Sequence, residues 1–537
     1  MNMFLQKILL IAAVLMVLPM STAWAALNKT IMYIPHDNRP ISFEQTADNV
    51  RALGFEVLTP PKVFLGSREK PEGYHDELVK WAKDNAKKAD AAVISSDALV
   101  YGSLVASRKH ELEPKEALQR VKVIDKIHKA NKNMKLYVFG SIMRTPRTEA
   151  DSGGLDDESF IRYVEDISAY TALLDKKEQT KLTRSEVKQL AEYEKTVPRD
   201  VLQKWLARRQ ANFSVNSALI DMVAQGDINY LVLGCDDNAK YSQTDRERRA
   251  LDDKYKALNL SKLQYQSLSG IDEIGYVLLT RAVNEMYGKK PFVSVHYAEG
   301  VGGDTIPAAS NEPIADTVAA QIQMAGGMAV KNDAAADLIF LVNTGFYGTT
   351  DAANAPSNVY EANEHIKDFA AMADKYIKEG RPVSIADITF GNGADNSLMQ
   401  QLYEKKLLDR LNGYSGWNTP TNSTGYAAAM GISSLYTDRK GILSMLEVRY
   451  IDDWLYQSNV RQSVANEISR IHGDGDYLNT GTKTMVLEMS ATQQLQELIK
   501  KYGLDKFAGQ SYVKDVRVYF PWHRMYEASF LFPDKQQ

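Results

Sequence analysis

The sequence predicts an α/β protein built on parallel sheets, and three observations support this prediction. Short apolar runs alternate with segments of helical periodicity, which is the pattern of βαβ units. The runs are continuously apolar rather than alternating, as expected for strands that helices cover on both faces. Polar residues follow directly after each run. The first block is therefore expected to be barrel-like or doubly wound.

Residues 1–25 have the layout of a cleavable secretory signal. Lys7 precedes an apolar run at 8–20, and Ala23-Trp24-Ala25 forms a small-residue cleavage site. The run is too short to span a bilayer comfortably, and no cysteine stands at the cleavage site. We therefore expect a mature chain that starts near Ala26, is periplasmic or secreted, and keeps no stable membrane anchor.

Composition limits the class of partner. The 64 lysines and arginines nearly balance the 68 aspartates and glutamates, giving a net charge of −4. Both signs are interspersed, which argues against a nucleic-acid binder. Cys235 is the only cysteine, so no intramolecular disulfide can form. We expect it to be a small buried side chain, with a reactive thiol as the alternative.

A first α/β domain is predicted over residues 26–304. Its expected strands are 30–35, 55–58, 91–94, 135–139, 230–233 and 292–297, and its expected helices include 43–53, 74–89, 114–129 and 272–287. Within it, residues 156–225 lack strand signals and are rich in charge, which is typical of solvated helices. This segment is expected to be a helical insertion that forms a lid or a wall above the site.

A second α/β domain is predicted over residues 305–440, after a glycine-rich bend at 300–303. Its expected strands are 337–342 and 383–387, and its expected helices are 313–325, 359–378 and 397–406. Residues 441–537 are expected to form a mostly helical C-terminal region. The sequence shows no internal repeat.

The stretch 230–241 gives the main signal for a site. Gly234 ends an apolar run, and Asp236 and Asp237 follow at once. The C-terminal end of a parallel strand is where α/β proteins place catalytic groups. Two adjacent carboxylates there can divide the roles of acid and partner. The alternative is a helix N-cap, since aspartate and asparagine cap helices well.

Polar residues after other strands extend the predicted site. Asp37 and Arg39 follow the first strand and can bind a polar ligand or pair with each other. Asp97 has the same placement after the third strand, with Tyr101 nearby, although a helix cap is the stronger interpretation there. Arg144 ends its strand and suits a carboxylate, a phosphate or the edge of a sugar.

Three further residues complete the set of expected ligand contacts. Tyr241 is expected to hold the substrate, and Trp417 beside Asn418 is typical of a sugar-stacking arrangement, with a buried tryptophan as the alternative. The loop 387–396 is rich in Asp and Asn but lacks a twelve-residue calcium pattern, so backbone shaping is favoured. We predict no metal ligand and no cofactor site.

Several catalytic signatures are absent from the sequence. It contains no Gly-Lys-Ser phosphate loop, no dinucleotide glycine fingerprint after the first strand, no His-Glu-x-x-His pair and no Gly-x-Ser-x-Gly elbow. These absences weigh against an NTPase, a dehydrogenase, a zincin and a serine hydrolase. Carboxylate chemistry and ligand binding remain.

Short segments along the whole mature chain resemble a bacterial family, the domain of unknown function number 4127. The segments are 33–40, 97–108, 142–144, 236–241, 272–275, 392–396, 416–419, 453–454 and 521–524. The resemblance therefore covers nearly all of the chain. It implies a shared α/β fold and implies no activity.

Together these features predict an exported, glycosidase-like hydrolase that acts on a saccharide. Asp237 is the expected general acid and Asp236 the carboxylate that orients or stabilises; a substrate N-acetyl group as nucleophile is also compatible. Asp37 and Asp97 are expected on the same rim. Two alternatives stay open: a non-catalytic periplasmic binding protein that closes on a polar small molecule, and a hydrolase that uses the same carboxylates around Mg²⁺ or Ca²⁺.

Overall fold

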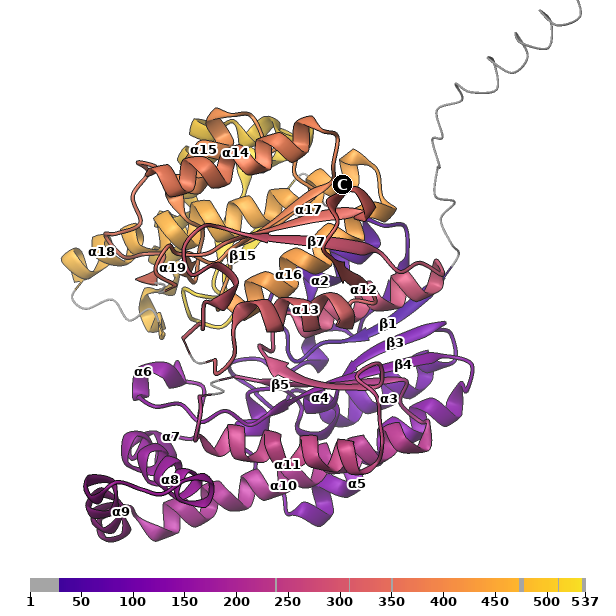
Figure 1. The fold of residues 1–537 in the computed structure, drawn as a ribbon, viewed down its shortest axis with the longest axis vertical. Coiled ribbons are helices and arrows are strands. Elements are labelled where there is room, and N and C mark those ends of the chain that lie inside the picture. Colours follow the sequence, from indigo (N-terminus) through magenta and orange to yellow (C-terminus); the bar gives the residue numbers. More distant parts are fainter. Residues whose placement is uncertain are drawn as a thin grey trace, which may run out of the picture.

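Two parallel sheets organise the molecule (Figure 1). The computed structural model describes residues 29–236, 239–308, 310–348, 351–472, 478–509 and 511–533. The proposed signal segment lies outside these residues. The α/β class predicted from the sequence is confirmed. Among the described residues, no helix combines the length and apolar character needed to cross a membrane.

The first sheet has six parallel strands in the order β2-β1-β3-β4-β5-β6. They are β1 (Thr30–Ile34), β2 (Glu56–Leu58), β3 (Ala91–Ser95), β4 (Lys135–Ile142), β5 (Tyr230–Cys235) and β6 (Tyr265–Ser269). β2 and β6 are free edges, so the sheet is open and doubly wound rather than barrel-like.

Helices cover both faces of the first sheet. The faces are packed by α2 (Glu44–Arg51), α3 (His75–Ala86), α4 (Ser96–Tyr101), α5 (Pro114–Ala130), α10 (Arg199–Gln225), α11 (Gln243–Ala257) and α12 (Ile274–Met286). Successive strand residues enter opposite cores: Ile31 and Tyr33 face one, and Met32 and Ile34 face the other. This alternation follows from the two-residue period of a strand, and burial on both sides explains the continuous apolar runs.

The second sheet has five parallel strands in the order β13-β11-β9-β7-β8. They are β7 (Phe292–Tyr297), β8 (Met328–Val330), β9 (Leu338–Asn343), β11 (Val383–Asp387) and β13 (Gly413–Ser415). Its helices include α13 (Ile314–Met324), α14 (Glu364–Lys378), α15 (Asn396–Glu404) and α16 (Pro420–Ser433). Taken in chain order, the first strand again lies between the second and the third, so the arrangement of the first sheet is repeated.

One domain boundary differs from the sequence prediction. The sequence places the strand at 292–297 in the first domain, but this strand pairs with β8 and β9 and so belongs to the second sheet. The change between sheets therefore falls between β6 and β7, before residue 292 rather than near 305. We refer below to the first unit, up to α12, and the second unit, from β7.

The two units share one hydrophobic core. α12 packs on the first sheet, α16 packs on the second, and the two helices contact each other between the sheets (Figure 1). Glycines on α16 allow both of its contacts: a Cβ on Gly425 would meet Cγ of Glu273, just before α12, at 2.4 Å, and one on Gly431 would meet Cβ of Ser384, on β11, at 2.6 Å. The core runs without interruption from β1 to β9, which disfavours free motion of one unit against the other.

The predicted helical insertion is present but does not form a wall of the site. It comprises α7 (Glu158–Ile161), α8 (Val164–Gln179), α9 (Arg184–Thr196) and α10. α8 and α9 lie at the far end of the first unit (Figure 1), because α10 carries them beyond the sheet that it covers. The short helix α6 (Glu149–Ser152), which precedes the insertion, lies beside the site instead.

The C-terminal region is largely helical, as expected, and ends in a strap that returns to the first unit. Its elements are α17 (Arg439–Arg449), a π-helix at Tyr450–Val460, α18 (Arg461–His472), α19 (Thr484–Tyr502) and the antiparallel strands β14 (Arg517–Tyr519) and β15 (Ser529–Leu531). Between β14 and β15, buried Trp522 donates from Nε1 to Asn38 Oδ1 at 2.8 Å. This contact joins the end of the chain to the loop after β1.

Candidate functional site

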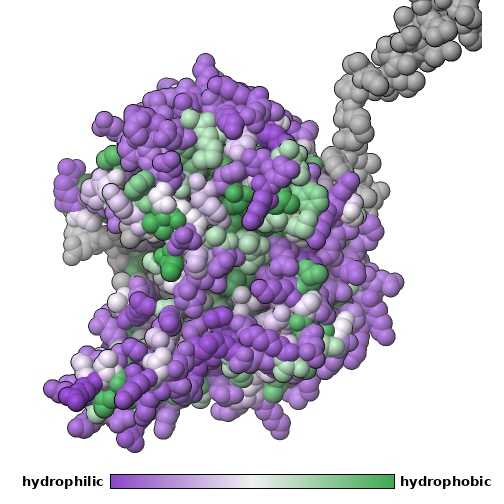
Figure 2. Space-filling view, in the orientation of Figure 1, coloured by the Kyte–Doolittle hydropathy of each residue, from purple (hydrophilic) through white to green (hydrophobic). Residues whose placement is uncertain are grey.

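The C-terminal ends of both sheets face a shared cavity of about 440 Å³, which we call the central cavity. The surface is notched between the two units on the side of α6 (Figures 1 and 2). The polar side chains that line the cavity are Arg39, Arg108, Arg144, Asp151, Ser152, Asp236, Asp272, Asp351, Asn392, Asn418, Thr419, Arg524, Tyr526 and Glu527. The loops after strands of both units thus supply one site, as expected for open parallel sheets.

The structure brings together five of the residues that the sequence singled out. Arg39, Arg144, Asp236, Trp417 and Asn418 all line the central cavity. Trp417 is buried to 9 % exposure, yet it remains part of the cavity wall. Asp37, Asp97, Tyr101 and Tyr241 do not belong to the cavity lining. Asp237 lies outside the described residues.

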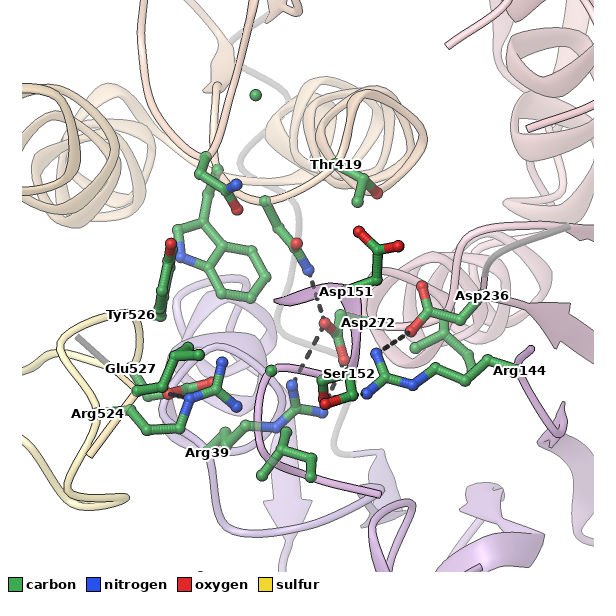
Figure 3. Close-up of a pocket in the computed structure, with 18 of the residues that line it drawn as sticks. Arg39, Arg144, Asp151, Ser152, Asp236, Asp272, Thr419, Arg524, Tyr526 and Glu527 are labelled. Atoms are coloured by element: carbon green, nitrogen blue, oxygen red, sulfur yellow. Dashed lines mark hydrogen bonds and ion pairs between the residues drawn. The ribbon is translucent and has the colours of Figure 1, made fainter. Parts of the chain in front are cut away.

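Arg39 ties the floor of the cavity together (Figure 3). Its Nε donates to Asp37 Oδ1 at 2.9 Å and its Nη2 donates to Asp272 Oδ1 at 2.8 Å. Burial opposes the charge of Arg39, but the Asp272 and Asp37 carboxylates outweigh it and raise the pKa of the guanidinium. Asn418, from the second unit, donates to Asp272 Oδ2 at 2.8 Å. This cluster therefore links the two units.

Asp37 is part of this floor and not of the rim. The sequence placed it among ligand contacts, but its carboxylate is completely buried and accepts from Arg39. A buried arginine needs a close carboxylate partner, and Asp37 fills that role two residues away. The local ion pair considered from the sequence is thus the interaction that forms.

Asp236 occupies the other side of the cavity, at the end of β5 (Figure 3). Its Oδ2 lies 3.3 Å from Arg108 Nη2 and 3.8 Å from Arg144 Nη1, and its side chain is 25 % exposed. Arg144 also pairs with Asp156, through Nε at 3.0 Å. Burial and the nearby Arg144 charge lower the pKa of Arg108. Asp236 is the carboxylate that these guanidinium groups present to the cavity.

The strap between β14 and β15 closes one wall with Arg524, Tyr526 and Glu527 (Figure 3). Arg524 Nε lies 3.4 Å from Glu527 Oε2. Burial lowers the pKa of Arg524, and the charges of Arg39, Arg68 and Arg144 lower it further, against the opposing effect of Glu527. The sequence analysis assigned no role to this wall.

Asp97 and Tyr101, which the sequence placed among the ligand contacts, lie on α4 and outside the lining of the central cavity. β3 runs directly into α4, where Ser95 Oγ accepts from the Ala98 amide, so the cap interpretation holds for this segment. Burial raises the pKa of Asp97 to about 7. His36 Nδ1 lies 3.6 Å from Asp97 Oδ2, and burial lowers the pKa of His36 to about 4. The helix seals this strand end.

Other residues that the sequence singled out have neighbours outside the lining of the central cavity. Tyr101 stacks on His110 with ring centroids 4.5 Å apart, and the Tyr241 ring lies 5.6 Å from Lys176 Nζ. Cys235 is buried, which raises the pKa of its thiol and disfavours a reactive thiolate. In the loop 387–396, Asp395 caps α15. Within the described residues, no group of three or more His, Cys, Asp and Glu side chains is placed to hold a metal ion.

Several lining residues were missed by reasoning from strand ends. Arg108 follows α4, Asp151 lies on α6, and Arg524 and Glu527 lie on the strap. For Arg108 and Arg524 the available signal was the set of segments that carry the family resemblance, whereas Asp151 and Glu527 lie outside these segments. All of the segments except 453–454 contribute a residue to the cavity lining, although they are spread along the chain.

The comparison with protein families gives a match that spans most of the chain. A family described as "Protein of unknown function (DUF4127)" matches residues 31–530. No curated protein matches the chain. The matched range contains both sheets, the helical insertion and every residue that lines the central cavity. The chain therefore belongs to the DUF4127 family.

Proposed function

We propose that the central cavity is the active site of an exported hydrolase that acts on a saccharide. The observation that carries the proposal is the Asp236 carboxylate, held by Arg108 and Arg144 in a cavity of about 440 Å³. That volume lies within the roughly 300–1,000 Å³ typical of small-molecule sites. Arginine, amide and hydroxyl groups line the same cavity and suit a ligand with many hydroxyl groups.

In this proposal Asp236 supplies the negative charge. A carboxylate beside two guanidinium groups suits stabilisation of a cationic, oxocarbenium-like transition state, or nucleophilic attack on the sugar. The general acid must carry a proton at the working pH, and Asp236, beside Arg108 and Arg144, takes the other role in this proposal. Asp237 remains the candidate for the general acid by its position in the sequence. Asp151 is a second candidate, because it lines the same cavity.

Trp417, Asn418 and Thr419 form the opposite wall, which belongs to the second unit. An aromatic face beside amide and hydroxyl groups is suited to contact with the apolar face of a sugar ring. Arg39 and Asp272 would fix this wall against the first unit through Asn418. The substrate would then lie between Asp236 and the Trp417 wall.

Hydrolysis of aryl glycosides, including N-acetylated ones, tests the proposal. On a substrate that the wild type cleaves, Asp236→Asn should lower kcat at least 100-fold, the lower range for loss of an acid–base or nucleophilic group. The melting temperature should change little, because Asp236 is partly exposed. Glu178→Gln alters an exposed carboxylate far from the cavity and serves as the control. Equal activity of Asp236→Asn and wild type would refute the assignment.

Asp237→Asn separates the two candidate acids. If Asp237 is the general acid, its replacement abolishes activity and leaves the melting temperature nearly unchanged, while Asp151→Asn stays active. The opposite pattern assigns the acid to Asp151. An Asp237→Asn protein that unfolds would identify Asp237 as a structural residue.

A non-catalytic binding protein for a polar ligand is the second candidate. The cavity between two α/β units favours it, whereas the uninterrupted core across α12 and α16 disfavours the hinge closure that such proteins use. It predicts a ligand-induced rise in melting temperature without turnover. A metal-dependent hydrolase would instead lose activity with a chelator and regain it with Mg²⁺ or Ca²⁺.

A further inference from the structure

Four arginines line the central cavity, and they differ in how fully they are paired. Arg39 donates to Asp37 and Asp272, and Arg144 pairs with Asp156. Arg108 donates to Asp236 at 3.3 Å. Two nitrogens of Arg524, the fourth, have no hydrogen-bond partner within the described residues.

Arg524 is a buried cation with unmade hydrogen bonds. Arg524 is only 7 % exposed. Within the described residues, its Nε and Nη1 atoms have no hydrogen-bond partner. The Glu527 oxygen at 3.4 Å is longer than the roughly 2.7–2.9 Å of a good charge-assisted bond. That oxygen, Oε2, is likewise without a hydrogen bond among the described residues. Unmade bonds of a buried charge are costly, and Arg524 is the arginine of this cavity that bears this cost.

The arginines around the cavity also repel one another. Burial lowers the pKa of Arg524, as do the charges of Arg39 and Arg144. Burial and Arg144 lower the pKa of Arg108 in the same way. Figure 3 shows Arg39, Arg144 and Arg524 around one space. An anion placed there would be attracted to these guanidinium groups, whose planar forks bind oxyanions.

We infer that the ligand of the central cavity carries an oxyanion, which Arg524 binds with support from Arg108. The inference rests on the proposed function and narrows its substrate class to acidic saccharides, which bear a carboxylate or a sulfate ester. The planar fork of a guanidinium matches either group through paired N–H donors. Asp236 is compatible with a nearby anion because Arg108 and Arg144 offset its charge.

Isothermal titration of the full mature chain with matched sugar pairs tests this inference. The pairs are glucose and glucuronate, galactose and galacturonate, and N-acetylglucosamine and its 6-sulfate; inorganic sulfate is the bare anion. At least one acidic member should bind tenfold or more tightly than its neutral partner. The preference should shrink as salt is added, because screening weakens charge pairing. Equal affinity within every pair, or no binding by any acidic member, overturns the inference.

Variants then assign the preference to Arg524. Arg524→Gln should reduce the preference at least tenfold, and Arg524→Lys should keep part of it, because a point charge replaces the fork. If Arg524→Gln fails to fold, Arg108→Gln and Arg524→Lys carry the test. Arg246→Gln, which changes an exposed arginine paired with Glu178, is the matched control and should bind like the wild type. An unchanged preference in a folded Arg524→Gln protein contradicts the assignment.

Binding and turnover fail independently in this design. Acidic preference without hydrolysis of any glycoside would sustain the oxyanion site and remove the proposed hydrolase. Hydrolysis that depends on Asp236 and shows no acidic preference would sustain the hydrolase and remove the oxyanion site.

Discussion

Both sheets end in aspartates, but the two units treat these carboxylates differently. At the ends of the first sheet, Asp37 and Asp272 pair with Arg39, and Asp236 pairs with Arg108. At the ends of the second sheet, Asp387 accepts from the Asn343 amide, the Tyr414 hydroxyl and the Asp395 backbone N–H. Within the described part of the chain, no lysine or arginine forms a salt bridge with Asp387 or Asp395.

The carboxyl groups at the strand ends therefore have different neighbours in the two units: guanidinium groups in the first, and amide, hydroxyl and carboxyl groups in the second. Burial raises the pKa of Asp387 and of Asp395, and their mutual repulsion adds to the effect on Asp387. The neutral form is therefore favoured for Asp387 and Asp395, whereas guanidinium groups pair with the strand-end carboxylates of the first unit. The position at a strand end alone does not make a carboxylate functional. The groups in contact with a carboxylate decide whether it contributes a negative charge to the central cavity.

The largest expected effect on stability comes from removing the Arg39 guanidinium, which pairs with two carboxylates of the first unit. Arg39→Met leaves the buried carboxylates of Asp37 and Asp272 without their partner, which should cost about 3–5 kcal/mol of unfolding free energy. Chemical denaturation measures this. The second-unit counterpart, Tyr414→Phe, removes one hydroxyl donor to Asp387 and should cost about 1 kcal/mol. Similar losses of unfolding free energy in the two variants would contradict the proposed difference between the units.

Asp97 tests whether the groups around a carboxyl, rather than the unit that contains it, decide its protonation. It lies in the first unit, yet burial raises its pKa to about 7, as in the second unit. A carboxyl whose folded pKa exceeds its unfolded pKa binds more protons in the native state between these values. Wild-type stability should therefore fall as pH rises from about 4 to about 7, by on the order of 3 kcal/mol from Asp97.

Asp97→Asn removes this titration and should flatten that part of the stability profile. The measurement is the difference in unfolding free energy between variant and wild type at pH 5 and at pH 8. The difference should shift in favour of the variant at pH 8. A difference that stays constant across this range would mean that Asp97 does not titrate within it.

The same substitution in both units gives the smallest and most direct contrast. Asp395→Asn keeps a good N-cap for α15 and removes a carboxylate whose neutral form burial favours, so it should change stability by less than about 1 kcal/mol. Asp272→Asn weakens charge-assisted bonds with Arg39 and should cost roughly 2–3 kcal/mol. Thermal and urea denaturation of both variants measure the pair. A larger loss of stability in Asp395→Asn than in Asp272→Asn would contradict the inference that burial favours the neutral form of Asp395.

Sequence reasoning located most of the sheet framework and part of the site. The apolar runs at 30–35, 91–94 and 230–233 are strands because local periodicity and burial on both faces are written in consecutive residues. Arg39, Arg144 and Asp236 reached the cavity because strand ends share an edge. Strand membership was harder to predict: β7 joined the second sheet through pairing with strands that follow it, and the repeated strand order left no trace in the sequence.

The sequence by itself determined an α/β chain with carboxylates and arginines at the ends of buried strands. Only the tertiary structure decided which of them meet. Arg39 and Asp272 lie 233 positions apart, and Trp522, which brings Arg524 to the cavity wall, bonds to a residue 484 positions away. Helix and strand patterns arise from neighbours along the chain, whereas charge depends on burial and on partners from any distance. The chemistry of the central cavity is set by that second kind of information.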